Sequence, residues 1–276
     1  MSEVKTADIA KLRKLTGAGM MDCKKALQES NGDIDKAIEL IRERGKAIAN
    51  KRADREASEG AALAATSADK KIGAVVALNC ETDFVAKNDD FVGLTNNILK
   101  VAIENKPADL EALKALKIDG RAIGDLVLDQ SGITGEKFEL SFYELIEGEV
   151  VVPYIHPGNK LACIVAFNKG GFDEQVGKDV AMQVAAMNPV AVDTDDVPEK
   201  VRQQEFEIGR EQARLEGKPE NMLDKIAQGK LQKFYKESTL MNQDFIKDSK
   251  MTISAYLKSI NADLKVIAFK RVSLNA

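Results

Sequence analysis

The stretch EGAALAATSADKKIGAVVALN at residues 59–79 has the same pattern as GEVVVPYIHPGNKLACIVAFN at residues 148–168. The two stretches align without a gap at an offset of 89 residues. Each contains an apolar run, a four-residue turn that ends in lysine, a second apolar run and a final asparagine. Two short apolar runs joined by such a turn are typical of a β-hairpin. The sequence therefore predicts two similar hairpins, and this repeat decides the fold class.

An amphipathic helix is expected after each hairpin. Apolar residues recur three or four positions apart from Phe91 to Ala102 in the first copy and from Phe172 to Met187 in the second. Residues at this spacing share one face of a helix, which can pack on a sheet. We therefore predict an α+β fold with two repeated subdomains, each a small antiparallel sheet with a helix on it. Phe91 and Phe172 are expected at the heads of the two helices.

Helical segments are also expected outside the repeat. Residues 4–55 hold three apolar clusters separated by residues 17–19 (GAG) and 31–33 (NGD), which predicts a three-helix module that continues into a charged, alanine-rich linker helix. Residues 197–216 and 221–237 carry thin apolar stripes and are expected to pair as an antiparallel helical hairpin. The predicted domains are the helical module with its linker (1–55), a first core subdomain (56–147), a second core subdomain (148–196 and 238–276) and the helical hairpin inserted in it (197–237).

The connection between hairpin and helix differs in length between the two copies. Residues 169–171 make this connection in the second copy, whereas the first copy uses the eleven residues 80–90 within NCETDFVAKNDDF. The additional residues are not needed to build the subdomain, yet they include an aromatic and charged motif: Thr82, Asp83, Phe84 and Val85. Such an insertion points to function. The alternative is that Phe84 folds back onto the sheet as a local core residue.

A second candidate for contact with a partner is the pair Met20 and Met21. Two neighbours on a helix cannot both face one core, so at least one methionine is expected at the surface, where its flexible side chain suits an adaptable apolar contact. The alternative is that one methionine lies inside the module and the other is half covered.

The sequence lacks the motifs of common enzymes. Residues 132–137 (GITGEK) do not have the spacing of a phosphate-binding P-loop. His156, the only histidine, lies in a predicted hairpin turn, and Cys163 lies in an apolar strand where a core thiol is expected. We therefore expect no catalytic residues, no metal site and no cofactor, and a protein that is not an enzyme.

Composition indicates which partners to expect. Lys and Arg together number 40 and Asp and Glu 44, so the net charge of -4 does not favour direct binding of nucleic acid. The three cysteines are far apart and form no CxxC pair, which is the pattern of a reducing compartment. No apolar run reaches about 18 residues, and the N-terminus has no leader-like segment. A cytoplasmic protein that does not enter a membrane and binds another protein is expected.

Several segments together resemble the elongation factor Ts family, the guanine-nucleotide exchange factors of elongation factor Tu. LRKLTGAGMMDCKKAL and NGDIDKAIELIRERG are similar to the family's ubiquitin-associated-like module, and NCETDFVAKNDDF is similar to its core loop. QVAAMNP is similar to a further family segment, with Gln183 where histidine is common. The resemblance covers nearly the whole chain.

The resemblance implies a translation elongation factor that binds elongation factor Tu in its GDP-bound and nucleotide-free states. It assigns Thr82, Asp83, Phe84 and Val85 to displacing the Mg²⁺ ion from the nucleotide site of the partner, with Phe84 as a wedge. It also implies that Met20 and Met21 dock on the G domain and that the region of His156 contacts another domain. The helical hairpin is a candidate surface for a homodimer.

Two alternatives stay open at this point. The first is a ubiquitin-associated-type adaptor whose N-terminal module binds an unrelated protein, which would leave the inserted residues unexplained. The second is a cysteine or metal hydrolase, which predicts activity without any partner.

Overall fold

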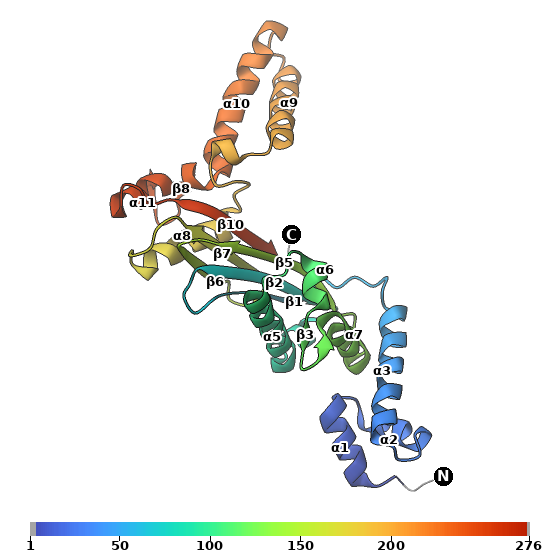
Figure 1. The fold of residues 1–276 in the computed structure, drawn as a ribbon. Helices are drawn as coiled ribbons and strands as arrows, with labels where there is room; N and C mark the ends of the chain where they lie inside the picture. The colour runs from blue at the N-terminus through green and yellow to red at the C-terminus, as the bar shows by residue number, and fades with distance from the viewer. Residues whose placement is uncertain (1–3, 275–276) are drawn as a thin grey trace. The chain divides into compact units, whose positions relative to one another are not determined.

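The computed structural model describes residues 4–274 and confirms an α+β fold (Figure 1). The helices are α1 (Thr6–Thr16), α2 (Met20–Glu29), α3 (Ile34–Lys51), α4 (Asp83–Ala86), α5 (Asp89–Asn105), α6 (Leu110–Ala115), α7 (Ile123–Thr134), α8 (Glu174–Met187), α9 (Glu199–Leu215), α10 (Leu223–Ser238) and α11 (Ile253–Ile260). The strands are β1 (Glu59–Thr66), β2 (Ile72–Cys80), β3 (Lys117–Ile118), β4 (Arg121–Ala122), β5 (Glu139–Glu147), β6 (Val150–Ile155), β7 (Leu161–Phe167), β8 (Asp244–Phe245), β9 (Asp248–Thr252) and β10 (Val266–Ser273). No helix among the described residues is both long and apolar enough to cross a membrane.

The chain forms two compact units. Of the described residues, the first contains 4–63, 76–143 and 273–274, and the second contains Ala64–Val75 and Glu144–Val272. Two three-stranded sheets have the strand orders β1-β2-β5 and β10-β7-β6. In each sheet, two of the strands come from one copy of the repeat, and the third strand comes from a distant part of the chain.

The two predicted hairpins turn in the same way, because equivalent residues make equivalent hydrogen bonds. The N–H of Lys70 donates to the carbonyl oxygen of Ser67 at 2.9 Å, and the N–H of Asn159 donates to that of His156 at 3.0 Å. Lys70 and Asn159, which are 89 residues apart, both have left-handed backbones with φ of 57° and 58°. The repeat seen in the sequence is therefore also a repeat of turn hydrogen bonds, although Gly158 has a left-handed φ of 92° and its counterpart Asp69 does not.

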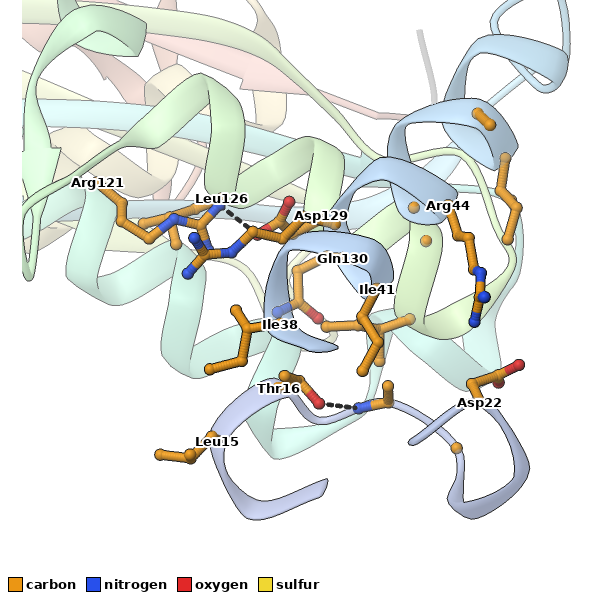
Figure 2. A pocket seen from close by; sticks show the side chains of 18 residues that line it. Leu15, Thr16, Asp22, Ile38, Ile41, Arg44, Arg121, Leu126, Asp129 and Gln130 are labelled. Atoms are coloured by element: carbon orange, nitrogen blue, oxygen red, sulfur yellow. Dashed lines mark hydrogen bonds and ion pairs between the residues drawn. The ribbon is translucent and has the colours of Figure 1, made fainter. Parts of the chain in front are cut away.

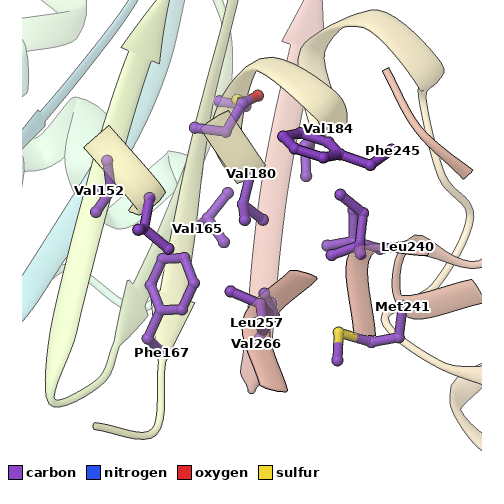
Figure 3. Packing of buried hydrophobic residues seen from close by; sticks show 14 of the residues in the cluster. Val152, Val165, Phe167, Val180, Val184, Leu240, Met241, Phe245, Leu257 and Val266 are labelled. Atoms are coloured by element: carbon purple, nitrogen blue, oxygen red, sulfur yellow. The ribbon is translucent and has the colours of Figure 1, made fainter. Parts of the chain in front are cut away.

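In the second unit, α8 packs on β6 and β7 and covers an apolar core (Figure 3). Strand register places Val152 beside Val165, and both side chains are buried under α8. A Cβ atom built on Gly177 would lie 2.6 Å from the side chain of Val152, so glycine at this position lets the helix approach the strand closely. Leu240, Phe245 and other residues after the helical hairpin complete this core.

The two phenylalanines that we expected at the heads of the repeat helices differ in position. Phe91 lies in the first turn of α5, is 4% exposed, and its ring centroid is 5.1 Å from that of Phe138. Phe172 lies before α8, because Asp173 caps that helix with its side chain. It packs half-buried against Phe167 at a centroid distance of 4.9 Å. The placement of Phe172 within the helix was therefore wrong, although its ring does pack on the core.

Residues 42–51, which we expected in a linker helix that continues the module, form the second part of α3. Helix α3 runs without a break from Ile34 to Lys51 and contacts α7, which also belongs to the first unit. A Cβ atom on Gly132 would lie 2.1 Å from the Cα of Gly45, so the two backbones meet through glycines. The contact uses small residues, and a search for an apolar stripe does not detect it.

The predicted helical hairpin is formed by α9 and α10, which contact each other along their length (Figure 1). The chain turns at Gly217, which has a left-handed φ of 72°. Gly209 of α9 lies close to Ala227 of α10, since an added Cβ would be 3.4 Å from that residue's Cα. Ion pairs such as Arg210–Asp224 at 3.0 Å join the outer faces of the two helices.

Candidate functional site

The inserted connection between β2 and α5 folds as the short helix α4, and it presents Phe84 to solvent. Phe84 is 85% exposed, whereas Ala86, two residues further on, is buried. The alternative that Phe84 is a local core residue is therefore wrong. The ring of Phe84 is mostly in contact with water, so burial contributes little to its free energy in this chain. Such an arrangement is expected of a residue that contacts a partner.

The neighbours of Phe84 are charged or half-buried. The carboxylate of Asp83 accepts a hydrogen bond at 2.6 Å from the ammonium group of Lys87, one turn later. This bond raises the pKa of Lys87 above its ordinary value, so the ammonium group is charged at neutral pH. Val85 and Thr82 are half-buried. The residues of the motif therefore surround an outward ring with one ion pair and two partly covered side chains.

Thr82 is held by Glu136, a residue that the sequence did not single out. The backbone N–H of Thr82 donates to one carboxylate oxygen of Glu136 at 3.0 Å, and its hydroxyl donates to the other at 2.6 Å. Glu136 follows α7 and lies in the GITGEK segment that we had considered only as a phosphate loop. This segment instead supplies an anchor for the residue immediately before α4.

Glu81 is the second anchor of α4. Its carboxylate accepts hydrogen bonds from Arg52 at 2.9 and 3.2 Å, from Arg55 at 3.0 Å and from the backbone N–H of Lys137 at 2.6 Å. Partial burial alone would raise the pKa of Glu81, but the bonds from Lys137, Arg52 and Arg55 outweigh it and lower the pKa from 4.5 to about 2. Glu81 is therefore ionised throughout the neutral range.

Cys80, the last residue of β2, is buried beneath the motif. Burial and the nearby carboxylate of Glu136 raise the pKa of its thiol to about 12, and the thiol donates to the carbonyl oxygen of Thr82 at 3.2 Å. A thiol with such a high pKa is a poor nucleophile at neutral pH. Cys80 therefore supports the backbone of the motif and is not a reactive group.

Both methionines of the N-terminal module are exposed. Met20 is 60% exposed and Met21 is 74% exposed at the start of α2, while Cys23, Ala26 and Leu27 on the same helix are fully buried. The alternative that one methionine lies inside the module is therefore wrong. Leu15, near the end of α1, is 59% exposed and adds apolar surface to the module.

His156 lies in the second unit, at the turn between β6 and β7, and is exposed. Its Nδ1 atom shares a hydrogen bond of 3.0 Å with the hydroxyl of Tyr154. Cys163 is buried, and burial raises the pKa of its thiol to about 12. An exposed turn histidine and a buried protonated thiol do not form a nucleophilic pair, so the hydrolase alternative has no support at this position.

The first unit also contains a cavity of about 660 Å³ between α1, α2, α3 and α7 (Figure 2). Apolar side chains such as Ile38, Ile41 and Ile133 line it, and an ion pair between Arg121 and Asp129 lies at one side. Within residues 4–274, no group of three or more His, Cys, Asp or Glu side chains is placed to hold a metal ion.

The exposed ring of Phe84 and the exposed Met20 and Met21 leave apolar surface that is available to another macromolecule. Comparison with known proteins gives the family. The family model described as elongation factor TS matches residues 81–276, which is more than half of the chain. The chain belongs to the elongation factor Ts family of translation factors.

Relatives named elongation factor Ts match over nearly the full length of the chain. The protein of Porphyromonas gingivalis is 57% identical over 271 residues, which cover 98% of this chain and 97% of the relative. That of Amoebophilus asiaticus is 55% identical with 98% of both chains covered, and that of Christiangramia forsetii is 49% identical with 99% and 100% covered. These matches include the N-terminal helices that the family model leaves out.

Proposed function

We propose that this protein binds elongation factor Tu in its GDP-bound state and promotes release of GDP, so that GTP can rebind. Membership of the elongation factor Ts family supports the role in translation and the identity of the partner. The observation that carries the proposal is the exposure of Phe84, at 85%, on a short helix whose preceding residues are firmly bonded. Such a ring is available to enter the partner.

The proposed mechanism acts on the Mg²⁺ ion of the partner. Mg²⁺ demands near-ideal octahedral geometry and is held at nucleotide sites by few protein ligands, so a small displacement of those ligands weakens its binding. Phe84 would wedge between side chains of the G domain, next to Asp83, and shift the elements that hold the ion. Thr82 and Val85 would frame the ring. Loss of Mg²⁺ then weakens the binding of GDP.

Docking would come from other parts of the chain. We propose that α1 to α3 form a ubiquitin-associated-like module that docks on the G domain through Met20 and Met21. The region of His156 in the second unit would contact a different domain of the partner. Because coupling between two ligands is reciprocal, a factor that weakens nucleotide binding is itself released when GTP binds. The nucleotide-free complex is therefore an intermediate of the cycle.

The adaptor alternative is not favoured, because it gives no role to the exposed ring of Phe84. The factor performs no chemical step on a substrate in this proposal, so it needs neither catalytic residues nor a cofactor. Its expected place is the cytoplasm, and direct binding of nucleic acid is not expected. A homodimer through α9 and α10 stays a prediction, which sedimentation at several protein concentrations would test.

Release of fluorescent GDP from elongation factor Tu tests the proposal directly. The protein should accelerate release at concentrations well below that of the partner, since each molecule acts repeatedly. Phe84→Ala should bind the partner and accelerate release far less. If the unaltered protein binds the partner and release continues at its unassisted rate, the exchange function is wrong and the adaptor alternative gains support.

A further inference from the structure

We infer that Glu81 and Glu136 form a clamp that positions the Phe84 wedge and links it to the residues that directly follow α3. This inference rests on the proposed function for its consequence, although the clamp itself is a property of the free protein. The clamp is defined by two carboxylates and their partners: Glu81 with Arg52, Arg55 and the N–H of Lys137, and Glu136 with the N–H and hydroxyl of Thr82. Glu81 and Glu136 are positioning residues, because neither is expected to touch the nucleotide site.

The clamp holds the wedge at its N-terminal side. Glu81 and Thr82 are the two residues before α4, and each is fixed by bonds to a part of the chain distant in sequence. Helix α4 has only four residues, which is too short for its own hydrogen bonds to hold it in place. Its position therefore depends on residues around it: the two that lead into it, and the buried Ala86 with α5 on the other side.

Arg52 connects the clamp to the docking module. Arg52 directly follows α3, and Arg55 lies three residues later, so both belong to the end of the N-terminal helical region. Helix α3 is in turn fixed to α7 by the Gly45–Gly132 contact, and Glu136 follows α7. The hydrogen bonds of Glu81 and Glu136 and the contact between Gly45 and Gly132 thus connect α3, α7 and the residues before α4. All of these parts belong to the first unit.

This arrangement has a consequence for exchange. A module docked through Met20 and Met21 would fix the partner relative to α3, and the clamp would fix the wedge relative to α3. The ring would then enter the partner from one direction with little loss of conformational freedom on binding. Breaking the clamp should lower the saturated exchange rate, whereas removing a docking residue should mainly raise the concentration needed for half-maximal exchange.

Mobility of the wedge can be measured in the free protein. The chain contains no tryptophan, so Phe84→Trp introduces a unique fluorophore at the wedge. In that background, Glu81→Gln or Glu136→Gln should lower the fluorescence anisotropy, because the local motion of residue 84 increases. Glu111→Gln is the matched control, since it removes one carboxylate from an exposed ion pair with Lys114 on α6. Equal anisotropy in all four proteins would overturn the clamp.

The exchange assay tests the coupling to α3. We expect Glu81→Gln and Arg52→Ala each to lower the saturated rate on the order of tenfold, with a smaller change in the half-maximal concentration. Arg52→Lys, which keeps the positive charge, should recover part of the rate. The double variant should be little worse than Glu81→Gln alone, since that change already removes the ion pair with Arg52. Losses that multiply in the double variant, or saturated rates equal to that of Glu111→Gln, would refute the coupling.

The results separate this inference from the proposed function. If Glu81→Gln accelerates GDP release normally and Phe84→Ala does not, the wedge hypothesis is retained and the clamp hypothesis is rejected. If the unaltered protein does not accelerate GDP release, the proposed function is wrong. The anisotropy measured in the Phe84→Trp background would still show whether Glu81 and Glu136 restrain residue 84. Circular dichroism of each variant verifies that it has folded.

Discussion

The two phenylalanines on either side of the α4–α5 junction should respond in opposite ways to truncation. Phe91 is 4% exposed and packs against Phe138, so Phe91→Ala leaves a cavity in the first unit. Truncation of a buried phenylalanine costs about 3–5 kcal/mol of unfolding free energy. Phe84 is 85% exposed and so buries at most 15% of its surface in this chain. Scaling the same cost by that fraction predicts a loss of roughly 0.5 kcal/mol for Phe84→Ala.

The effect of Phe84→Ala on the exchange rate should be large, in contrast to its small effect on stability. Phe84→Ala should slow GDP release from elongation factor Tu strongly although the protein stays folded. When Mg²⁺ has already been removed with a chelator, the difference between Phe84→Ala and the unaltered protein should shrink, since the proposed task of the wedge is then partly done. Asp83→Ala should follow the same pattern more weakly.

Urea unfolding followed by circular dichroism gives the stability of each variant, and stopped-flow release of fluorescent GDP gives the exchange rate. Both should be measured with and without chelator. If Phe84→Ala lowers the unfolding midpoint as much as Phe91→Ala does, the ring has a structural role. If Phe84→Ala is stable and exchanges nucleotide at the normal rate, the wedge mechanism is wrong.

Three other outcomes are expected. Changing Met20 and Met21 together to Ala should raise the half-maximal concentration for exchange more than it lowers the saturated rate, with a few kcal/mol as the ceiling for such anchors, and an unchanged concentration would count against docking. Gly132→Ala should destabilise the first unit in urea unfolding because its Cβ would meet the α3 backbone, whereas Gly93→Ala, which meets no atom within 4 Å, should be neutral or slightly stabilising. Glu81, whose pKa is lowered to about 2, stabilises the folded state above about pH 4.5, and this contribution is lost as the pH falls toward 2. Because the arginines are partly exposed, solvent screening reduces this contribution to the free energy of unfolding to about 1–2 kcal/mol. The stability difference between the unaltered protein and Glu81→Gln should therefore be largest at neutral pH and should shrink near pH 3.

The hairpins were predictable because their signal is local. Each copy has a four-residue turn, at residues 68–71 and 157–160, between two short apolar runs. Apolar runs on either side of the turn then fix which residues pair. The sequence also showed that the second copy closes the same connection without the additional residues, so the scaffold does not require them. It did not decide whether Phe84 is exposed, because an apolar loop residue can still fold back onto the sheet.

The contacts that hold the wedge could not be predicted, because their signal is not local. Arg52 is 29 residues from Glu81, and Thr82 is 54 residues from Glu136. A charged residue in a polar stretch is usually solvated, and nothing in the pattern distinguishes Glu81 from its neighbours. The contact between Gly45 and Gly132 was missed for a similar reason, since two glycines add nothing to an apolar stripe.

The position of these polar contacts follows from what a wedge requires. An apolar side chain is normally held in place by burial, but burial would make Phe84 unavailable to a partner. A protein that must keep such a ring exposed and still restrain it has to fix the backbone on one side of the ring by directional bonds. The bonds to Glu81 and Thr82 do this with charged acceptors, which form stronger hydrogen bonds than neutral ones. In the proposed complex, the apolar contact of Phe84 would then supply free energy that acts against the binding of the nucleotide.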